Sequence, residues 1–207
     1  MISKNKLTET RPLEGYKISE TFYGIGMPEG LNQEVIVLGG KTYIGKFSNL
    51  KYKAHKTDNL NLVFFASAHI PKWQKVIIPK DIKTFSAFQT YLANTAKTKG
   101  LDTKKGFMFR LEAEMESLKW FIVSGMGNLK PSALKSFLRQ RILGGLESRK
   151  IEALGTYSEK LRGVASAPST PMHMHFITID EGKFFVGHID NDFLIKSNAT
   201  LYLPITP

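Results

Sequence analysis

Three stretches of the sequence have the side-chain patterns of β-strands. Residues 34–47 (EVIVLGGKTYIGKF) carry β-branched side chains on both sides of Gly39-Gly40, which is a strong signal for a hairpin with a two-residue turn. Residues 60–70 (LNLVFFASAHI) form an apolar run that suits a buried strand. Residues 106–117 (GFMFRLEAEMES) alternate apolar and polar side chains, as a half-buried strand does. The sequence therefore predicts a β-rich protein.

Two other stretches repeat apolar side chains every three or four residues, which is the spacing of an amphipathic α-helix. The first covers residues 81–96 (DIKTFSAFQTYLANTA). The second covers residues 130–149, where a proline lies near the start and the helix is expected to extend to Gly144-Gly145. The glycines and the proline of residues 23–30 (YGIGMPEG) favour a loop there.

Strands with two intervening helices predict an α+β fold that is β-rich, with largely antiparallel or mixed sheets. Residues 119–125 (KWFIVSG) are expected to pair with the strand that precedes them. The polar residues 1–20 are expected to form an N-terminal arm, and residues 21–207 a single domain. Two tightly packed β-rich halves, about 21–125 and 126–207, are the alternative division of that domain.

The composition is typical of a globular protein. The 207 residues are 42% hydrophobic and 23% charged, which supplies enough apolar side chain for a core and excludes a disordered chain. No apolar run approaches the roughly 20 residues of a transmembrane helix, so no membrane partner is expected. The N-terminal sequence MISKNKLTETRPLEG lacks the apolar core of a signal peptide. We therefore expect a cytoplasmic protein, with secretion still open if the N-terminus is processed.

An excess of basic residues gives the chain a formal net charge of +11, with 29 Lys and Arg against 18 Asp and Glu. Such a charge favours anionic partners, which include nucleic acids, acidic membrane surfaces and small carboxylates. The basic residues are scattered, and zinc-finger, basic-zipper and RNA-recognition spacings are absent, so nucleic-acid binding is not expected. An exposed edge strand in so β-rich a chain would favour a homodimer.

The absence of cysteine restricts any metal site to His, Asp, Glu or backbone oxygen ligands. The chain has five histidines, and three of them, His173, His175 and His188, fall in one short segment near the C-terminus. The other two, His55 and His69, have no histidine near them in the sequence and are expected in a loop and at a strand end. The cluster near the C-terminus is therefore the strongest indication of chemistry.

The segment that contains the three histidines (MHMHFITIDEGKFFVGHIDNDFLI) has the pattern of a β-hairpin. With residues 181–182 as the two-residue turn, His175 faces His188, and His173 faces Asp190. The turn position decides the result, because a slip of one residue would place His188 on the opposite face.

On this register the three imidazoles converge. His173 and His175 share one face of their strand, because side chains alternate with a period of two. His188 joins them from the neighbouring strand, where Cβ atoms of facing residues lie about 4.5–5.5 Å apart. All three imidazoles could then bind a common zinc ion, each with a nitrogen at roughly 2.0–2.1 Å. The ion would keep a coordination position open, as catalytic zinc sites do. Asp190 would be a further ligand or an acceptor that orients His173. An incidental surface His-x-His pair is the alternative.

Five segments carry a resemblance to one family: HMHF (173–176), GHIDNDF (187–193), FYGIGMPEGLNQEVIVLGGKTYI (22–44), LVFFASA (62–68) and FMFRLEAEM (107–115). On these segments the chain resembles the bacterial alpha-acetolactate decarboxylase family. The resemblance implies an acetolactate-decarboxylase-like fold and a catalytic domain over most of the chain. It also implies a zinc-dependent lyase that converts 2-acetolactate to acetoin and carbon dioxide.

The resemblance assigns roles to five residues. His173, His175 and His188 match the zinc ligands of the family, and Glu34 and Arg110 match an active-site glutamate and an active-site arginine. The implied substrate is a small anionic 2-hydroxy-3-keto acid. Arg110 would hold the substrate carboxylate with its guanidinium fork, and Glu34 would relay protons as a general acid and base.

The sequence departs from the family at three points. Met27 stands where the family usually has threonine, and the turn between the second and third histidines is longer. The C-terminal tail of the family, which carries a second acidic residue to the metal, has no counterpart, so Asp190, Glu181 or a neighbouring subunit is expected to supply that carboxylate. These departures keep two alternatives open: a zinc-hydroxide hydrolase at the same three histidines, and a non-enzymatic basic binding module.

Overall fold

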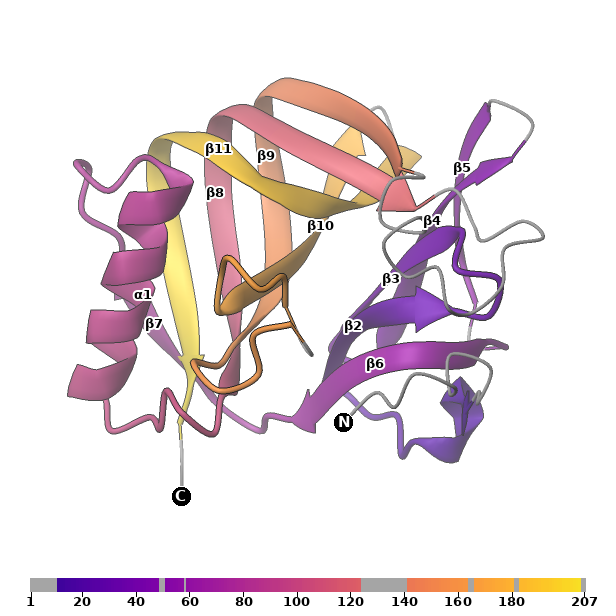
Figure 1. The fold of residues 1–207 in the computed structure, drawn as a ribbon, viewed down its shortest axis with the longest axis horizontal. Helices are drawn as coiled ribbons and strands as arrows, with labels where there is room; N and C mark the ends of the chain where they lie inside the picture. The colour runs from indigo at the N-terminus through magenta and orange to yellow at the C-terminus, as the bar shows by residue number, and fades with distance from the viewer. Residues whose placement is uncertain are drawn as a thin grey trace.

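Two antiparallel sheets, formed successively along the chain, make up most of the structure (Figure 1). The computed structural model describes residues 11–48, 51–57, 59–123, 141–163, 166–180 and 183–205. The expected fold class, β-rich α+β with largely antiparallel sheets, is confirmed. The boundary between the two sheets falls near residue 70, and the domain limits expected from the sequence stay a prediction.

The first sheet has six strands in the order β1-β6-β2-β3-β4-β5. Its strands are β1 (Arg11–Pro12), β2 (Phe22–Pro28), β3 (Gln33–Leu38), β4 (Lys41–Ser48), β5 (Lys51–Lys56) and β6 (Asn61–His69), with the short 3-10 helix η1 (Leu13–Gly15) after β1. The hairpin expected over residues 34–47 is confirmed, because Leu38 pairs with Lys41. Gly39 and Gly40 have φ values of 54° and 76°, as a type I′ turn requires.

The prediction of a loop over residues 23–30 is wrong for most of its length, because β2 occupies residues 22–28. The glycines of this strand make close packing possible. A Cβ atom on Gly24 would collide with the ring of Phe65, and one on Gly26 would collide with the carbonyl oxygen of Phe64. Here glycine marks the close approach of two strands, which is a recognised alternative to a turn.

The second sheet has five strands in the order β10-β9-β8-β11-β7. They are β7 (Trp73–Ile77), β8 (Phe107–Val123), β9 (Arg141–Tyr157), β10 (Met172–Asp180) and β11 (Lys183–Pro204). Since β10 also pairs with β11, strands β8 to β11 close on themselves. The prediction that residues 119–125 form a separate strand paired with 106–117 is wrong for residues 119–123, because β8 continues through both segments.

The first predicted helix is confirmed as α1 (Phe85–Thr98), which lies on the side of the second sheet away from the first sheet (Figure 1). Thr84 caps it by accepting a hydrogen bond from the Ala87 N–H at 3.2 Å. The buried side chains of α1, Phe88, Leu92 and Ala96, belong to the core of the second sheet. No helix of the described residues has the length and apolar character needed to cross a membrane.

The second predicted helix is not present where it can be compared. Residues 130–140 lie outside the described residues, and residues 141–149 belong to β9. Long-range pairing overrides the local spacing here, since Val123 of β8 pairs with Arg141 and Trp120 pairs with Gly144. The ring of Trp120 also lies where a Cβ atom on Gly144 would be, so the glycine accommodates a cross-strand aromatic side chain.

The two sheets are in contact beside β11. A Cβ atom on Gly45 of β4 would collide with the carbonyl oxygen of Val186, so these strands approach closely. The Tyr52 hydroxyl accepts a hydrogen bond from the Val186 N–H at 2.6 Å and donates one to its carbonyl oxygen at 3.2 Å. These contacts hold β11 against the first sheet two residues before His188.

Candidate metal centre

Three histidine side chains meet between the two sheets. His173 and His175 come from β10 and His188 comes from β11, and their ligand atoms all lie within 4.8 Å of one another. The register expected from the hairpin is confirmed, because His175 pairs with His188 and Asp180 pairs with Lys183. His188 also pairs with Phe121 of β8, so its backbone has a neighbouring strand on each side.

The tautomer of His175 follows from its hydrogen bond across the sheet interface. This side chain is fully buried, and its Nδ1 lies 2.8 Å from the carbonyl oxygen of Val35 in β3. A carbonyl oxygen can only accept, so Nδ1 carries the hydrogen and Nε2 carries a lone pair. That Nε2 lies 3.0 Å from the Nε2 of His173. A histidine held in this way by a backbone carbonyl has the form of a metal ligand.

Glu34 of β3 lies at the same place, as the resemblance implied. Its side chain is fully buried, and its Oε1 accepts a hydrogen bond from the Val123 N–H at 3.3 Å. Its Oε2 lies 3.3 Å from the Nε2 of His175 but has no hydrogen-bond partner among the described residues. In the metal-free chain, burial raises the pKa of Glu34 to about 8, and the bond from Val123 acts more weakly in the opposite direction.

This donor set fits a divalent metal ion. Burial lowers the pKa values of His175 and His188 well below the ordinary histidine value, with a smaller contribution from His173, so both rings are held neutral. Neutral imidazole and carboxylate are the forms that bind metals. Oε2 of Glu34, which has no hydrogen-bond partner among the described residues, lies beside Nε2 of His175, and a cation bound there would give this oxygen a partner. Three imidazoles suit first-row transition ions such as zinc.

Aromatic and apolar side chains surround the imidazoles. The ring of Phe121 stacks on His188 with centroids 4.1 Å apart, and the ring of Phe64 lies 5.8 Å from that of His173. Phe121 is in a buried cluster with Leu31 and Val123. Phe64 and Phe121 lie in segments predicted as strands, but the sequence did not show which face of each strand meets the histidines.

Arg110, the other catalytic residue that the resemblance implied, has partners outside the histidine cluster. Its guanidinium forms ion pairs with Glu112, at 2.9 Å, and with Glu152. It lies 4.8 Å from the ring centroid of Tyr202 and lines a hollow of about 430 Å³ with Tyr43. No contact of Arg110 with the three histidines is present among the described residues, and its role as a carboxylate anchor stays a prediction.

Asp190, one of the acidic residues suggested as an additional ligand, is not in the histidine group found among the described residues. Oδ1 of Asp190 lies 3.2 Å from the Nη1 of Arg141, and this ion pair accounts for its orientation. Glu181 lies outside the described residues. Arg141 itself lies over the ring of Phe121, with its guanidinium carbon 4.6 Å from the ring centroid. Sequence reasoning missed Arg141 because its segment was predicted as helix.

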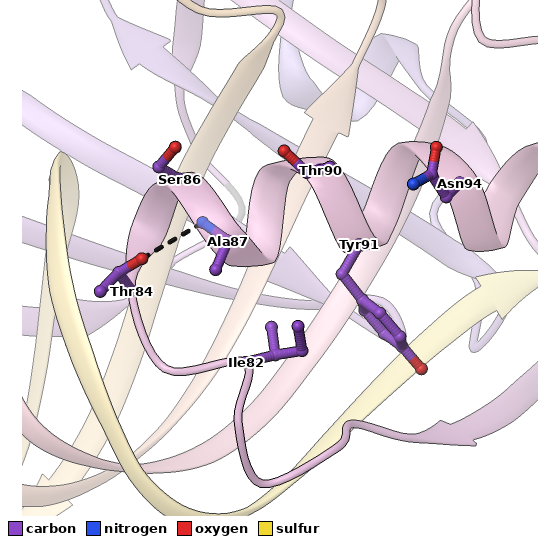
Figure 2. A pocket seen from close by; sticks show the side chains of 7 residues that line it. All are labelled: Ile82, Thr84, Ser86, Ala87, Thr90, Tyr91 and Asn94. Carbon is purple, nitrogen blue, oxygen red and sulfur yellow. Dashed lines mark hydrogen bonds between the residues drawn. The ribbon is translucent and has the colours of Figure 1, made fainter.

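A second hollow lies along α1, about 540 Å³ in volume (Figure 2). Its lining residues are Ile82, Thr84, Ser86, Ala87, Thr90, Tyr91 and Asn94. The hydrogen bond drawn between Thr84 and Ala87 in Figure 2 is the cap of α1. These side chains include no histidine or carboxylate, so the histidine centre is the better candidate for catalysis.

The fold is that of acetolactate-decarboxylase-like proteins. The solved structure of alpha-acetolactate decarboxylase from Bacillus subtilis strain 168 superposes with a TM-score of 0.72 at 17% identity, over 97% of this chain and 80% of that one. Acetolactate decarboxylase from B. subtilis subspecies spizizenii gives 0.70 at 18% identity, over 91% and 74%. A Staphylococcus aureus protein of unknown function, similar to alpha-acetolactate decarboxylase, gives 0.70 at 14% identity, over 97% and 80%. No protein-family model and no curated protein matches the sequence.

Proposed function

We propose that this protein is a metal-dependent lyase that decarboxylates 2-acetolactate, or a similar 2-hydroxy-3-keto acid, to acetoin and carbon dioxide. Zinc is the proposed metal, and His173, His175 and His188 are its proposed ligands. The observation that carries the proposal is the convergence of these imidazoles with the buried Glu34 carboxyl group. The acetolactate-decarboxylase-like fold adds support.

The reaction breaks the bond between the carboxylate and C2 of the substrate. Carbon dioxide leaves, the bonding electron pair stays on the substrate, and the carbon that lost the carboxylate takes up one proton to give acetoin. A bound divalent ion would act as a Lewis acid and stabilise the negative charge that develops on the substrate oxygens.

Glu34 is the proposed proton donor. Its carboxyl group is buried against the histidines, and Val123 and the sheet interface hold it in place. It can deliver a proton if the acceptor carbon comes within about 2.6–3.2 Å, or through one water molecule. Phe121 and Phe64 cover the imidazoles and would keep bulk water from protonating the carbon on the wrong face.

The metal content of the purified protein tests the centre. His173→Ala and His188→Ala each remove one proposed ligand, and His69→Ala is the matched control, because its ring bonds Thr21 at the far end of β6. We expect about one zinc ion per chain in the wild type and the control, and a loss of tenfold or more in affinity in the two ligand variants. Full metal content in both ligand variants, with circular dichroism unchanged, would refute the centre.

The reaction is tested by incubating the metal-loaded protein with racemic 2-acetolactate and measuring acetoin and carbon dioxide. We expect both products in equal amounts, and neither with the His188→Ala variant. Hydrolysis of an aryl ester without acetoin release would favour a hydrolase at the same centre. Strongly salt-dependent nucleic-acid binding that survives His175→Ala, with no turnover, would favour the basic binding module.

A further inference from the structure

Strand pairing places the backbone of Arg141 close to the metal centre. It is the first residue of β9, and it pairs with Val123 of β8. The N–H of Val123 donates the hydrogen bond to Glu34. The strand register therefore carries Arg141 to the end of the sheet where the carboxyl group of Glu34 is held.

The side chain of Arg141 is directed at the same place. Its guanidinium carbon lies 4.6 Å from the ring centroid of Phe121, and the ring of Phe121 also stacks on that of His188, with centroids 4.1 Å apart. Its Nη1 lies 3.2 Å from Oδ1 of Asp190, two residues after His188 in β11. The side chain is 34% exposed, so solvent and a dissolved anion can reach it.

We propose that Arg141, held on Phe121 by Asp190, binds the carboxylate of the substrate whose remaining oxygens face the three histidines. This inference rests on the proposed function. A planar guanidinium carries five N–H donors and binds a carboxylate through two parallel hydrogen bonds. Within the described part of the chain, Arg141 bonds the one carboxylate of Asp190, which leaves donors that can meet a second carboxylate, while the ring of Phe121 fixes the plane of the fork.

The charges favour Arg141 over Arg110 as the anchor. Arg110 is paired with two carboxylates, those of Glu112 and Glu152, so this group of three side chains carries a net negative charge. Arg141 is paired with one carboxylate, that of Asp190, so the pair is neutral in sum. A substrate anion approaching Arg141 therefore meets less repulsion.

The anchor has a characteristic kinetic effect. The carboxylate loses its negative charge as it becomes carbon dioxide, so its attraction to Arg141 weakens in the transition state. An interaction that is strongest with the bound substrate contributes to KM more than to kcat. We therefore expect Arg141→Gln to raise KM at least tenfold and to change kcat much less.

Binding of an unreactive probe tests the anchor independently of turnover. The probe is 2-hydroxy-2-methylpropanoate, which has the hydroxyl and carboxylate of the substrate but no ketone, and its uncharged amide is the matched ligand. Calorimetric titration of the metal-loaded wild type, Arg141→Gln, Arg141→Lys and Arg110→Gln gives the affinities. Arg149→Gln, which removes the same charge further along β9, is the control.

We expect Arg141→Gln to weaken binding of the carboxylate by about 10- to 100-fold and to leave the amide and the metal content unchanged. Arg141→Lys restores part of the affinity, and Arg149→Gln matches the wild type. Wild-type affinity in Arg141→Gln, loss of affinity in Arg110→Gln instead, or no binding of the carboxylate by the wild type would each overturn the anchor. Binding with these effects but without acetoin formation would support the anchor and refute the proposed reaction.

Discussion

Replacing Glu34 with glutamine should make the metal-free protein more stable and should lower the proposed lyase activity. Burial raises the pKa of Glu34 from its ordinary value of 4.5 to about 8. Between pH 4.5 and about pH 8, the folded chain keeps a proton on Glu34 that the unfolded chain releases. The free energy of unfolding therefore falls as the pH rises through this range. A glutamine side chain has no such proton. Its carbonyl can still accept from Val123, and its amide can donate to the lone pair of His175.

The size of the effect follows from the two pKa values of Glu34. One pKa unit is equivalent to about 1.4 kcal/mol, so keeping Glu34 protonated in the fold costs about 1 kcal/mol at pH 5, about 3 at pH 7 and about 4 at pH 8. Glu34→Gln removes this cost and should increase the free energy of unfolding by these amounts. The same change removes the proposed proton donor and should lower acetoin formation by a factor of about 100 or more.

Urea unfolding of the metal-free proteins, followed by tryptophan fluorescence at pH 5, 7 and 8, measures the gain. Glu29→Gln is the control, because this glutamate lies exposed just after β2 and its carboxylate accepts a hydrogen bond from the side-chain amide of Asn61. The control should change the free energy of unfolding by less than about 0.5 kcal/mol at every pH. A gain in Glu34→Gln that is the same at pH 5 and pH 8, or a loss of stability at pH 8, would refute the argument.

Three further predictions concern packing and the histidines. Burial lowers the pKa values of His175 and His188 below 6.5, so below this pH the unfolded chain binds protons that the folded chain excludes. Stability of the metal-free Glu34→Gln variant should therefore fall by about 1.4 kcal/mol per pH unit for each histidine as the pH drops below 6.5, and a flat urea midpoint from pH 7 to 5 would contradict this. Gly45→Ala places a methyl group against the carbonyl oxygen of Val186 and should cost roughly 1–3 kcal/mol in urea unfolding, whereas an unchanged midpoint would show that the sheets can separate locally. Phe88→Ala empties a buried position under α1 and should cost about 3–5 kcal/mol, with metal content per folded chain unchanged, while loss of metal would show that α1 and the centre are coupled.

The histidine centre could be predicted from the sequence because its geometry is local. A two-residue turn sets the pairing of the hairpin, and the alternation of side chains then brings His175 opposite His188. Glu34 was identified through the resemblance alone, since β3 is brought beside β10 by the packing of one sheet against the other. The hydrogen bond from His175 to Val35 is one of these contacts.

Other parts of the fold depended on long-range pairing that a local pattern does not contain. The segment after Arg141 has helical spacing, but Gly144 accommodates the ring of Trp120 from β8, and strand pairing prevails. The glycines of β2 were interpreted as a loop for the same reason, since the rings and backbone of β6 that they accommodate lie forty residues away. The sequence did not indicate a role for Arg141 because its neighbours come from β8 and β11, and only long-range strand pairing brings them together.

The position of His188 between two strands has a consequence for how this architecture can change over time. Main-chain hydrogen bonds to β10 and β8 set the direction of its side chain, and these bonds do not depend on which residues form the rim of the site. Under the proposed function, substitutions at Phe64 or Arg141 would therefore change which molecule binds while the imidazoles keep their arrangement. The same three histidines would then serve different substrates, with selectivity decided by the side chains around them.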